Sequence, residues 1–305
     1  MSTRNRWTLA DLPDLTGTRA VVTGVTAGLG TETARELLRA GAEVVLVARS
    51  AGKLEATVAA LGTEVPHAKV HPVIVDLADL SSVRRGAAEI AELGELDLLI
   101  NNAGVMALPY SRTVDGFELQ LGTNHFGPFL LTGLLLPQLV ASGHGRVVYV
   151  ASQAHRFARR APLGDPRTQQ GRYSKWAAYG GSKLANIMST FELDRRLRAA
   201  GLPVSALAAH PGYSATELVG KTGGVGGAVM TAATKVLGQR ADLGALPTLM
   251  AATADLPGGT YVGPDGFAQM RGYPQVVRAR RAAYDEEVQR RLWDLSEVAT
   301  GVRYP

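Results

Sequence analysis

Short apolar segments alternate with longer segments of helical periodicity along most of the chain. The apolar segments are rich in Val, Leu and Ile, and they cover residues 20–23, 44–48, 70–75, 96–100, 146–151, 204–209 and 260–262. Continuous apolar strands separated by helices are typical of a parallel sheet that is buried on both faces. With right-handed crossovers, this order predicts an α/β fold with a doubly wound, seven-stranded parallel sheet.

The helical segments end at the residues expected of helix ends. They cover residues 28–40, 51–61, 79–93, 113–141 and 177–200, and a last amphipathic helix is expected at about 275–296. Gly41, Gly62 and Gly94 follow the first three, where a left-handed C-cap favours glycine. The glycine-rich stretch at 220–227 predicts a substrate flap at about 213–240, or else a plain surface insertion. We expect residues 1–305 to form a single domain.

Composition and charge exclude several classes of protein. The chain has 305 residues, of which 46% are hydrophobic and 19% charged, so a sizeable core is expected. It contains no cysteine, which excludes disulfides, thiolate metal sites and cysteine nucleophiles and fits a cytoplasmic setting. The net charge of +5 arises from basic residues scattered among acids, so nucleic-acid binding is not expected. Neither an integral membrane segment nor a metal site is expected.

A glycine-rich turn follows the first predicted strand. The sequence TGVTAGLG places Gly24, Gly28 and Gly30 between this strand and a helix. Such a loop lets a diphosphate approach the backbone, and the helix N-terminus supplies free N–H groups and a positive dipole end. The spacing differs from G-x-G-x-x-G, so a plain glycine-rich turn is the alternative.

Arg49 lies at the end of the second predicted strand, 19 residues after Gly30. An acid at this place binds the ribose 2′-hydroxyl of NAD, whereas an arginine accommodates the 2′-phosphate of NADP. The sequence therefore favours NADP(H), with NAD(H) also possible. The alternative is that Arg49 is only a solvated residue at a strand end.

Tyr179 and Lys183 are four residues apart in a predicted helix and therefore share one face. A lysine ammonium favours the ionised form of a tyrosine, whose pKa near 10 is otherwise high for proton transfer at neutral pH. Ser152 follows the fifth predicted strand, at the sheet edge where open α/β sheets place ligands. Alone, the serine is as compatible with a helix cap.

These motifs together resemble those of the short-chain dehydrogenase/reductase family, over nearly the whole chain. The matching segments are Thr23–Gly30, Asn101–Gly104, Asn124, Ser152, Tyr179 with Lys183, and Pro211, Gly212 and Thr216. The resemblance implies a Rossmann-type domain and a catalytic tetrad of Asn124, Ser152, Tyr179 and Lys183. The cofactor-binding residues that it implies are Thr23, Gly24, Thr26, Gly28, Leu29, Gly30, Arg49, Asp76, Leu77, Asn102, Ala103, Gly104, Tyr179, Lys183, Pro211, Gly212 and Thr216.

The resemblance also implies a role for each group. Tyr179 would be the general acid or base, Ser152 would hydrogen-bond the substrate oxygen, and Asn124 would position a water. Lys183 would also hold the nicotinamide ribose. Asp76 would bind the adenine amino group, although a helix N-cap explains it equally well.

Several phrases, among them NNAGVMALP and YVGPDGF, are similar to the retinol-dehydrogenase-like branch. We expect a lipophilic alcohol or carbonyl substrate, with His125 and His210 as packing residues and the 153–173 segment beside the substrate. The family commonly forms homodimers or homotetramers. The rival hypotheses are an epimerase or dehydratase of the same family, and a non-catalytic NADP(H)-sensing protein.

Overall fold

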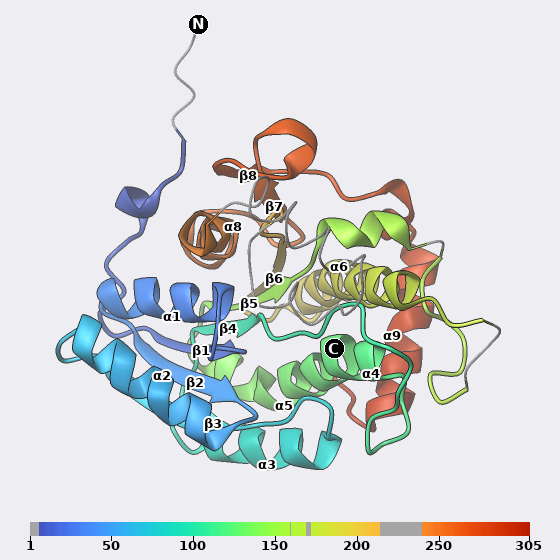
Figure 1. Cartoon of the computed structure of the whole chain (residues 1–305), viewed down its shortest axis with the longest axis horizontal. Helices are drawn as coiled ribbons and strands as arrows, with labels where there is room; N and C mark the ends of the chain where they lie inside the picture. The colour runs from blue at the N-terminus through green and yellow to red at the C-terminus, as the bar shows by residue number, and fades with distance from the viewer. Residues whose placement is uncertain (1–5, 159, 169–171, 214–239) are drawn as a thin grey trace, which may run out of the picture.

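The computed structural model describes residues 6–158, 160–168, 172–213 and 240–305. They form one eight-stranded sheet in the order β3-β2-β1-β4-β5-β6-β7-β8 (Figure 1). The strands are β1 Arg19–Thr23, β2 Glu43–Ala48, β3 Lys69–Ile74, β4 Leu98–Asn101, β5 Gly145–Val150, β6 Val204–Ala209, β7 Tyr261–Pro264 and β8 Pro274–Val276. Successive strands are added in one direction from β1 to β3 and in the opposite direction from β4 onward, so the sheet is doubly wound, as predicted.

The eighth strand corrects the predicted count of seven. Strands β1 to β7 are parallel, whereas β8 runs antiparallel to β7, with Val262 opposite Val276 and Gly263 opposite Gln275. Residues at the start of the predicted 275–296 helix therefore belong to a strand. Pro274 lacks the N–H that a helix interior needs, and the β-branched Val276 favours extended backbone.

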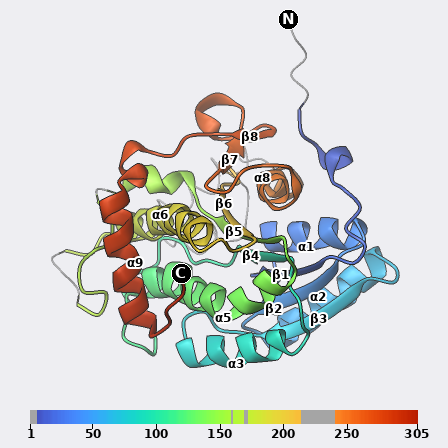
Figure 2. The same ribbon diagram turned by 180° about the vertical axis from the view of Figure 1, so that it is seen from behind.

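Helices cover both faces of the sheet (Figures 1 and 2). On one face, α1 Leu29–Arg39, α2 Ala51–Glu64 and α8 Ala241–Thr253 pack with residues such as Val22, Leu46 and Ile100. On the other face, α3 Leu80–Ala91, α5 Gly127–Ala141 and α6 Lys175–Ala199 pack with Val21, Val45 and Leu99. Neighbouring residues of one strand, such as Val21 and Val22, thus pack into the cores on opposite faces of the sheet. Because both faces are buried, these strands are apolar without interruption.

The C-terminal helix α9 covers Glu286–Thr300, later than predicted. It begins there because the Asp285 carboxylate accepts a hydrogen bond from Val288 N, and two glutamates in the first turn favour the positive end of the helix dipole. Trp293 of α9 is fully buried, with its ring 4.8 Å from that of Phe129 in α5. Figure 2 shows α9 lying across the outer side of α5 and α6. A short 3-10 helix, η5 Arg281–Tyr284, precedes it.

The helix predicted over 113–141 starts late and is irregular. Residues 113–118 form a turn in which Gly116 has φ of +84°, and the Glu118 carboxylate caps the short helix α4 Leu119–Leu121. A π-helical turn, η2 Gly122–Phe126, then joins α4 to α5. Local π-helices are rare and are frequent at functional sites.

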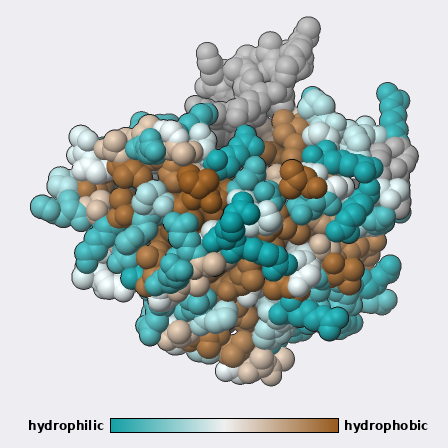
Figure 3. Space-filling view, turned by 90° about the horizontal axis from the view of Figure 1, so that it is seen from below, coloured by the Kyte–Doolittle hydropathy of each residue, from teal (hydrophilic) through white to brown (hydrophobic). Residues whose placement is uncertain are grey.

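The face seen in Figure 3 carries hydrophobic and hydrophilic side chains side by side. Among the helices of the described residues, none is long and apolar enough to cross a membrane. Most of the predicted flap at 213–240, together with Thr216, lies outside the described residues.

Candidate active site

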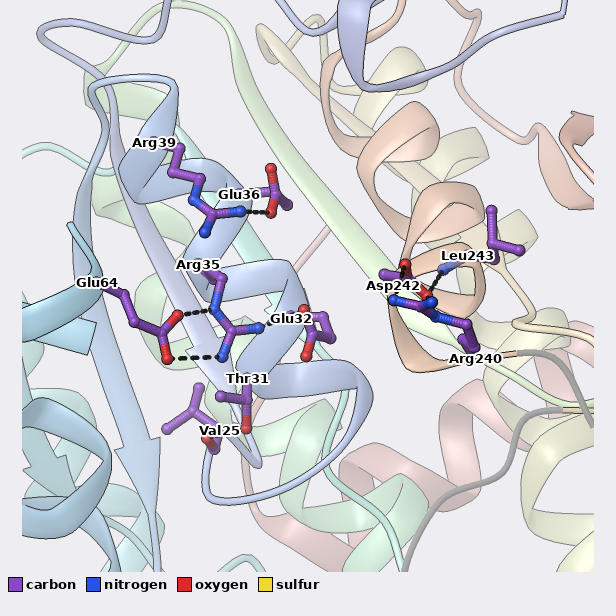
Figure 4. Close-up of polar contacts among 10 residues, drawn as sticks. All are labelled: Val25, Thr31, Glu32, Arg35, Glu36, Arg39, Glu64, Arg240, Asp242 and Leu243. Carbon is purple, nitrogen blue, oxygen red and sulfur yellow. Dashed lines mark hydrogen bonds and ion pairs between the residues drawn. The ribbon is translucent and has the colours of Figure 1, made fainter. Parts of the chain in front are cut away.

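The glycine-rich turn after β1 brings backbone groups close together. Gly24 and Gly28 have φ of +75° and +62°, a conformation that L side chains rarely adopt. A Cβ on Gly30 would collide with the carbonyl oxygen of Gly24 and lie 2.5 Å from the Asn102 amide nitrogen. The Thr31 hydroxyl donates to Val25 O at 2.7 Å and holds the turn against α1 (Figure 4). Because Gly28 has no side chain, no cap covers the N-terminus of α1.

The loop after β4 is bonded to this turn. The Thr23 hydroxyl accepts hydrogen bonds from the backbone N–H groups of Asn102 and Ala103, both at 3.0 Å. The Asn102 amide donates to Thr23 O at 2.8 Å. Thr26 and Leu29 are half-buried in the turn and at the start of α1. The N-N-A-G motif therefore fixes the shape of the glycine-rich turn from the neighbouring strand.

Ser152, Tyr179 and Lys183 meet near the carboxyl end of β5. Ser152 precedes the 3-10 helix η3 Gln153–Phe157 and caps it, since its hydroxyl accepts a hydrogen bond from Ala154 N at 3.2 Å. The hydroxyl also forms a hydrogen bond with that of Tyr179. Lys183 lies one helical turn after Tyr179 in α6, and its Nζ donates to Val150 O at 2.8 Å. Ser152 is therefore a helix cap, and it also lies beside Tyr179 as the resemblance predicts.

Burial controls the protonation of this group. Burial raises the pKa of Tyr179 above its ordinary value of 10, and the hydrogen bond with Ser152 opposes this rise. Burial also lowers the pKa of Lys183 from 10.5 to about 8. The expected lowering of the tyrosine pKa by the lysine is therefore not seen in this structure, where burial is the largest cause of the shift. At neutral pH the phenol is protonated, which is the form required of a general acid.

Asn124 lies in the π-helical turn and is fully buried. Its amide accepts from Val105 N at 2.7 Å and donates to Val105 O and to the Ser182 hydroxyl, both at 2.9 Å. Ser182 in turn donates to Tyr179 O at 2.8 Å. A Cβ on Gly104 would lie 3.1 Å from Asn124 Oδ1 and 3.3 Å from Lys183 Nζ. Asn124 is thus connected to Tyr179 through Ser182, and the loop after β4 lies close to both Asn124 and Lys183.

Arg49 is exposed at the end of β2, and it makes no hydrogen bond or ion pair within the described ranges. Helix α2 starts two residues later, and the side chain of its N-cap residue Ser50 makes no capping hydrogen bond. An unpaired guanidinium beside a free helix N-terminus is a suitable place for a phosphate group. In contrast to Arg49, Arg35 of α1 is paired, because its guanidinium forms ion pairs with Glu32 and Glu64 (Figure 4).

Asp76 and Leu77 follow β3. The Asp76 carboxylate accepts from Ala78 N at 2.9 Å, but the N-cap of α3 is Asp79, whose carboxylate accepts from Ser81 N and Ser82 N. The N-cap alternative for Asp76 is therefore wrong, and its carboxylate shapes the turn before the helix. Leu77 is buried, with its carbonyl oxygen packed against Gly127.

Sequence reasoning missed the loop between β7 and β8. The backbone N–H of Gly212 donates to His210 Nδ1 at 3.2 Å, so the opposite ring nitrogen carries the proton and donates to Gln269 Oε1 at 3.2 Å. Gln153 Nε2 donates to the same oxygen at 2.8 Å. Gln269 therefore joins the neighbour of Ser152 to the P-G motif. The sequence marks only a turn here, through Gly266 and Gly272.

The buried histidines are neutral. Burial lowers the pKa of His125 and His155 to about 4 and that of His210 to about 3. They serve as fixed hydrogen-bonding groups at neutral pH, which agrees with the packing role expected for His125 and His210. Within the described ranges, no three His, Asp or Glu side chains are grouped as metal ligands.

Comparisons with known proteins find relatives that match most of the chain. A family model described as short chain dehydrogenase matches residues 18–163. Human retinol dehydrogenase 13 is 40% identical over 299 residues, which cover 95% of this chain and 86% of the relative. Mouse polyprenol dehydrogenase is 39% identical and covers 92% of this chain and 83% of its own length.

A solved structure agrees over the full length. An uncharacterized protein from Mycobacterium paratuberculosis is 46% identical with a TM-score of 0.83, and the alignment covers 99% of this chain and 100% of that one. The fold shared with this structure and the match to retinol dehydrogenase 13 over 95% of the chain together identify the family. The chain belongs to the short-chain dehydrogenase/reductase family, in its retinol-dehydrogenase-like branch.

Proposed function

We propose that the protein transfers hydride between NADP(H) and a lipophilic alcohol or carbonyl compound, with Tyr179 as general acid and base. The observation that carries this proposal is the contact of two hydroxyl groups, those of Ser152 and Tyr179, with Lys183 one helical turn away. A carbonyl oxygen seated between the two hydroxyls would receive a hydrogen bond from each.

In the reducing direction, the Tyr179 phenol donates its proton to the substrate oxygen while Ser152 keeps that oxygen in place. The nicotinamide ring, when bound, supplies the hydride. The raised pKa of Tyr179 keeps the phenol protonated at neutral pH, as reduction requires. In the oxidising direction, the phenolate accepts the alcohol proton, so this direction is favoured at higher pH.

The residues around the glycine-rich turn fit a dinucleotide. The close approach of Gly24 and Gly30 leaves no space for side chains, and the uncapped N-terminus of α1 can accept a diphosphate. The free guanidinium of Arg49 would hold the 2′-phosphate, and the Asp76 carboxylate would hold the adenine amino group. A gluconate 5-dehydrogenase structure from Beutenbergia cavernae, 27% identical with a TM-score of 0.60, is described with bound NADP.

The substrate class rests on the named relatives. Retinol and polyprenol, which appear in the names of two relatives, are lipophilic alcohols. This supports a lipophilic substrate for the present chain as well.

The reaction is tested by following oxidation of NADPH with a panel of lipophilic ketones and aldehydes. Tyr179→Phe should lower turnover by about 10²- to 10⁴-fold while NADPH still binds. Tyr110→Phe is the matched control, because the Tyr110 hydroxyl lies on the surface and accepts from Arg112. Full turnover by Tyr179→Phe would refute the mechanism. Tight NADPH binding with no turnover, together with partner binding that depends on NADPH, would favour the non-catalytic sensor.

The cofactor preference is tested separately. Arg49→Ala should weaken NADPH binding by about tenfold or more, as expected for loss of a hydrogen bond to a charged group, and leave NADH binding nearly unchanged. Arg85→Ala, on the exposed side of α3, is the control. Equal losses for NADPH and NADH would contradict the proposed role of Arg49.

A further inference from the structure

The π-helical turn that carries Asn124 is an unusual local structure that the rest of the fold must hold. At its end, the backbone N–H of Gly127 donates to Gly122 O, five residues earlier. Such a turn contains one residue more than an α-helical turn, and it is rare among proteins. A return to α-helical geometry would change the direction of the Asn124 side chain, because the direction of each side chain depends on the number of residues per turn. The position of the Asn124 amide therefore depends on what holds this turn.

The residue after Asn124 connects this turn to the C-terminal helix α9. His125 Nε2 lies 2.8 Å from Ser296 Oγ of α9. The single hydrogen of the Ser296 hydroxyl is donated to Leu292 O at 2.7 Å. Ser296 Oγ must therefore accept from His125, so the neutral ring carries its proton on Nε2. While the Asn124 amide bonds to the loop after β4 and to α6, its neighbour bonds to α9.

The hydrogen bond between His125 and Ser296 lies in the core, and no second bond duplicates it. Both side chains are fully buried, so water cannot replace either partner. His125 Nδ1 is also buried and has no hydrogen-bond partner among the described residues. Asn186 of α6 lies beside this nitrogen, but its buried Oδ1 is an acceptor, as Nδ1 of the neutral ring is, so the two atoms do not bond. Removal of the Ser296 hydroxyl would therefore leave a buried N–H unpaired, which is costly.

Helix α9 is itself fixed on both sides of Ser296. Three residues before it, the Trp293 ring lies 4.8 Å from that of Phe129 and 4.7 Å from that of Tyr304. Four residues after it, Thr300 O accepts from the Arg84 guanidinium of α3 at 2.7 Å. A side chain held between two such contacts has little freedom to move. Ser296 can therefore act as a rigid anchor for the histidine.

We propose that Ser296 of α9, acting through His125, positions the Asn124 amide in the candidate active site. Ser296 and His125 are then positioning residues, because they act through Asn124. The C-terminal helix would in this way set the geometry of a group from the middle of the sequence. The inference rests on the proposed function, since Asn124 belongs to the tetrad that the family resemblance implies, but the positioning itself is tested without turnover.

The first measurement is hydrogen exchange of the Val105 N–H, followed by nuclear magnetic resonance. This N–H donates to Asn124 Oδ1 at 2.7 Å, so its protection reports whether the Asn124 amide is in place. Ser296→Ala should speed this exchange by about tenfold. The matched control is Thr300→Val, one helical turn later in α9, which also removes a buried hydroxyl that donates to a carbonyl four residues earlier. Unchanged exchange in Ser296→Ala, or equal rises in both variants, would overturn the proposal.

The second measurement is steady-state turnover with NADPH and a lipophilic ketone or aldehyde. Ser296→Ala should lower kcat by about tenfold and keep the KM for NADPH within about twofold, because a small displacement of a positioned group affects the reacting geometry more than cofactor binding. His125→Gln keeps an N–H donor within reach of Ser296 and should retain more of kcat than His125→Leu. In an Asn124→Ala background, Ser296→Ala should not lower kcat further, and equal losses in both backgrounds would overturn the proposal.

The two measurements separate this inference from the proposed function. A wild-type chain that binds NADPH without any turnover would refute the proposed reaction. The exchange of the Val105 N–H would still decide the positioning, because a rise in Ser296→Ala alone supports it and an unchanged rate refutes it.

Discussion

Replacing Lys183 by methionine is expected to stabilise the folded chain although it removes a proposed catalytic cation. The lysine is only 4% exposed, and burial lowers its pKa from 10.5 to about 8. Methionine has a similar length and carries no charge. Its thioether adapts to irregular space in a core, so large repacking is not required.

The size of the effect follows from the pKa. A shift from 10.5 to about 8 corresponds to about 3 kcal/mol of destabilisation at neutral pH, because the unfolded chain binds the proton more tightly than the folded one. The substitution also leaves Val150 O without its hydrogen bond from Nζ, which costs about 1 kcal/mol or somewhat more. The variant should therefore be more stable than wild type by about 2 kcal/mol near neutral pH.

The pH dependence has a defined sign. The folded pKa is lowered, so between about pH 8 and pH 10.5 the unfolded chain holds more protons, and wild-type stability rises with pH relative to the variant. The advantage of Lys183→Met should shrink by about 2 kcal/mol between about pH 7 and about pH 9.5. Urea unfolding followed by circular dichroism measures both quantities. A variant less stable than wild type at neutral pH, or a difference that does not change with pH, would refute the reasoning.

Three further substitutions test the fold and the site. Gly30→Ala should lower NADPH affinity by about tenfold or more, because the new Cβ meets the Gly24 carbonyl oxygen; unchanged affinity in titration would contradict the tight turn. Gln269→Leu should raise the KM for cofactor and lower kcat, whereas Gln269→Glu, which keeps the acceptor oxygen for Gln153 and His210, should recover both; equal kinetics for the two variants would exclude this role. Trp293→Ala should cost about 3–5 kcal/mol in urea unfolding, and a loss below about 1 kcal/mol would show that α9 contributes little to the core.

The sheet was predictable because its signal is local. Except for the half-exposed edge strand β3, each strand from β1 to β7 is a short apolar segment buried on both faces, and a one-dimensional pattern contains that information. The same holds for the glycine-rich turn, whose positive φ values restrict the residue type at each place. Strand β8 was not predicted, because its three residues have no periodicity of their own and depend on pairing with β7.

The electrostatics of the site were less predictable. The spacing of Tyr179 and Lys183 correctly placed them one helical turn apart, but the direction of the tyrosine pKa shift depends on how many atoms surround the phenol. Burial of this kind comes from the whole fold, so the sequence alone favoured the charge effect and gave the wrong sign. The bonds of Asn124 to Val105 and Ser182 likewise arise from the π-helical turn, which no pattern indicated.

In the β7–β8 loop, the free-energy cost of a strained backbone is close to the stabilisation from the hydrogen bonds that hold it. Ala268 and Gln269 have φ of +49° and +57°, a left-handed conformation that costs about 1–2 kcal/mol for each non-glycine residue. Three hydrogen bonds oppose this cost: Gln153 donates to Ala268 O at 3.1 Å and to Gln269 Oε1, and His210 donates to the same Oε1. Each contributes about 0.5–1.5 kcal/mol, so the two totals nearly balance. The loop that joins the serine segment to the cofactor motif can therefore change shape at a low cost in free energy.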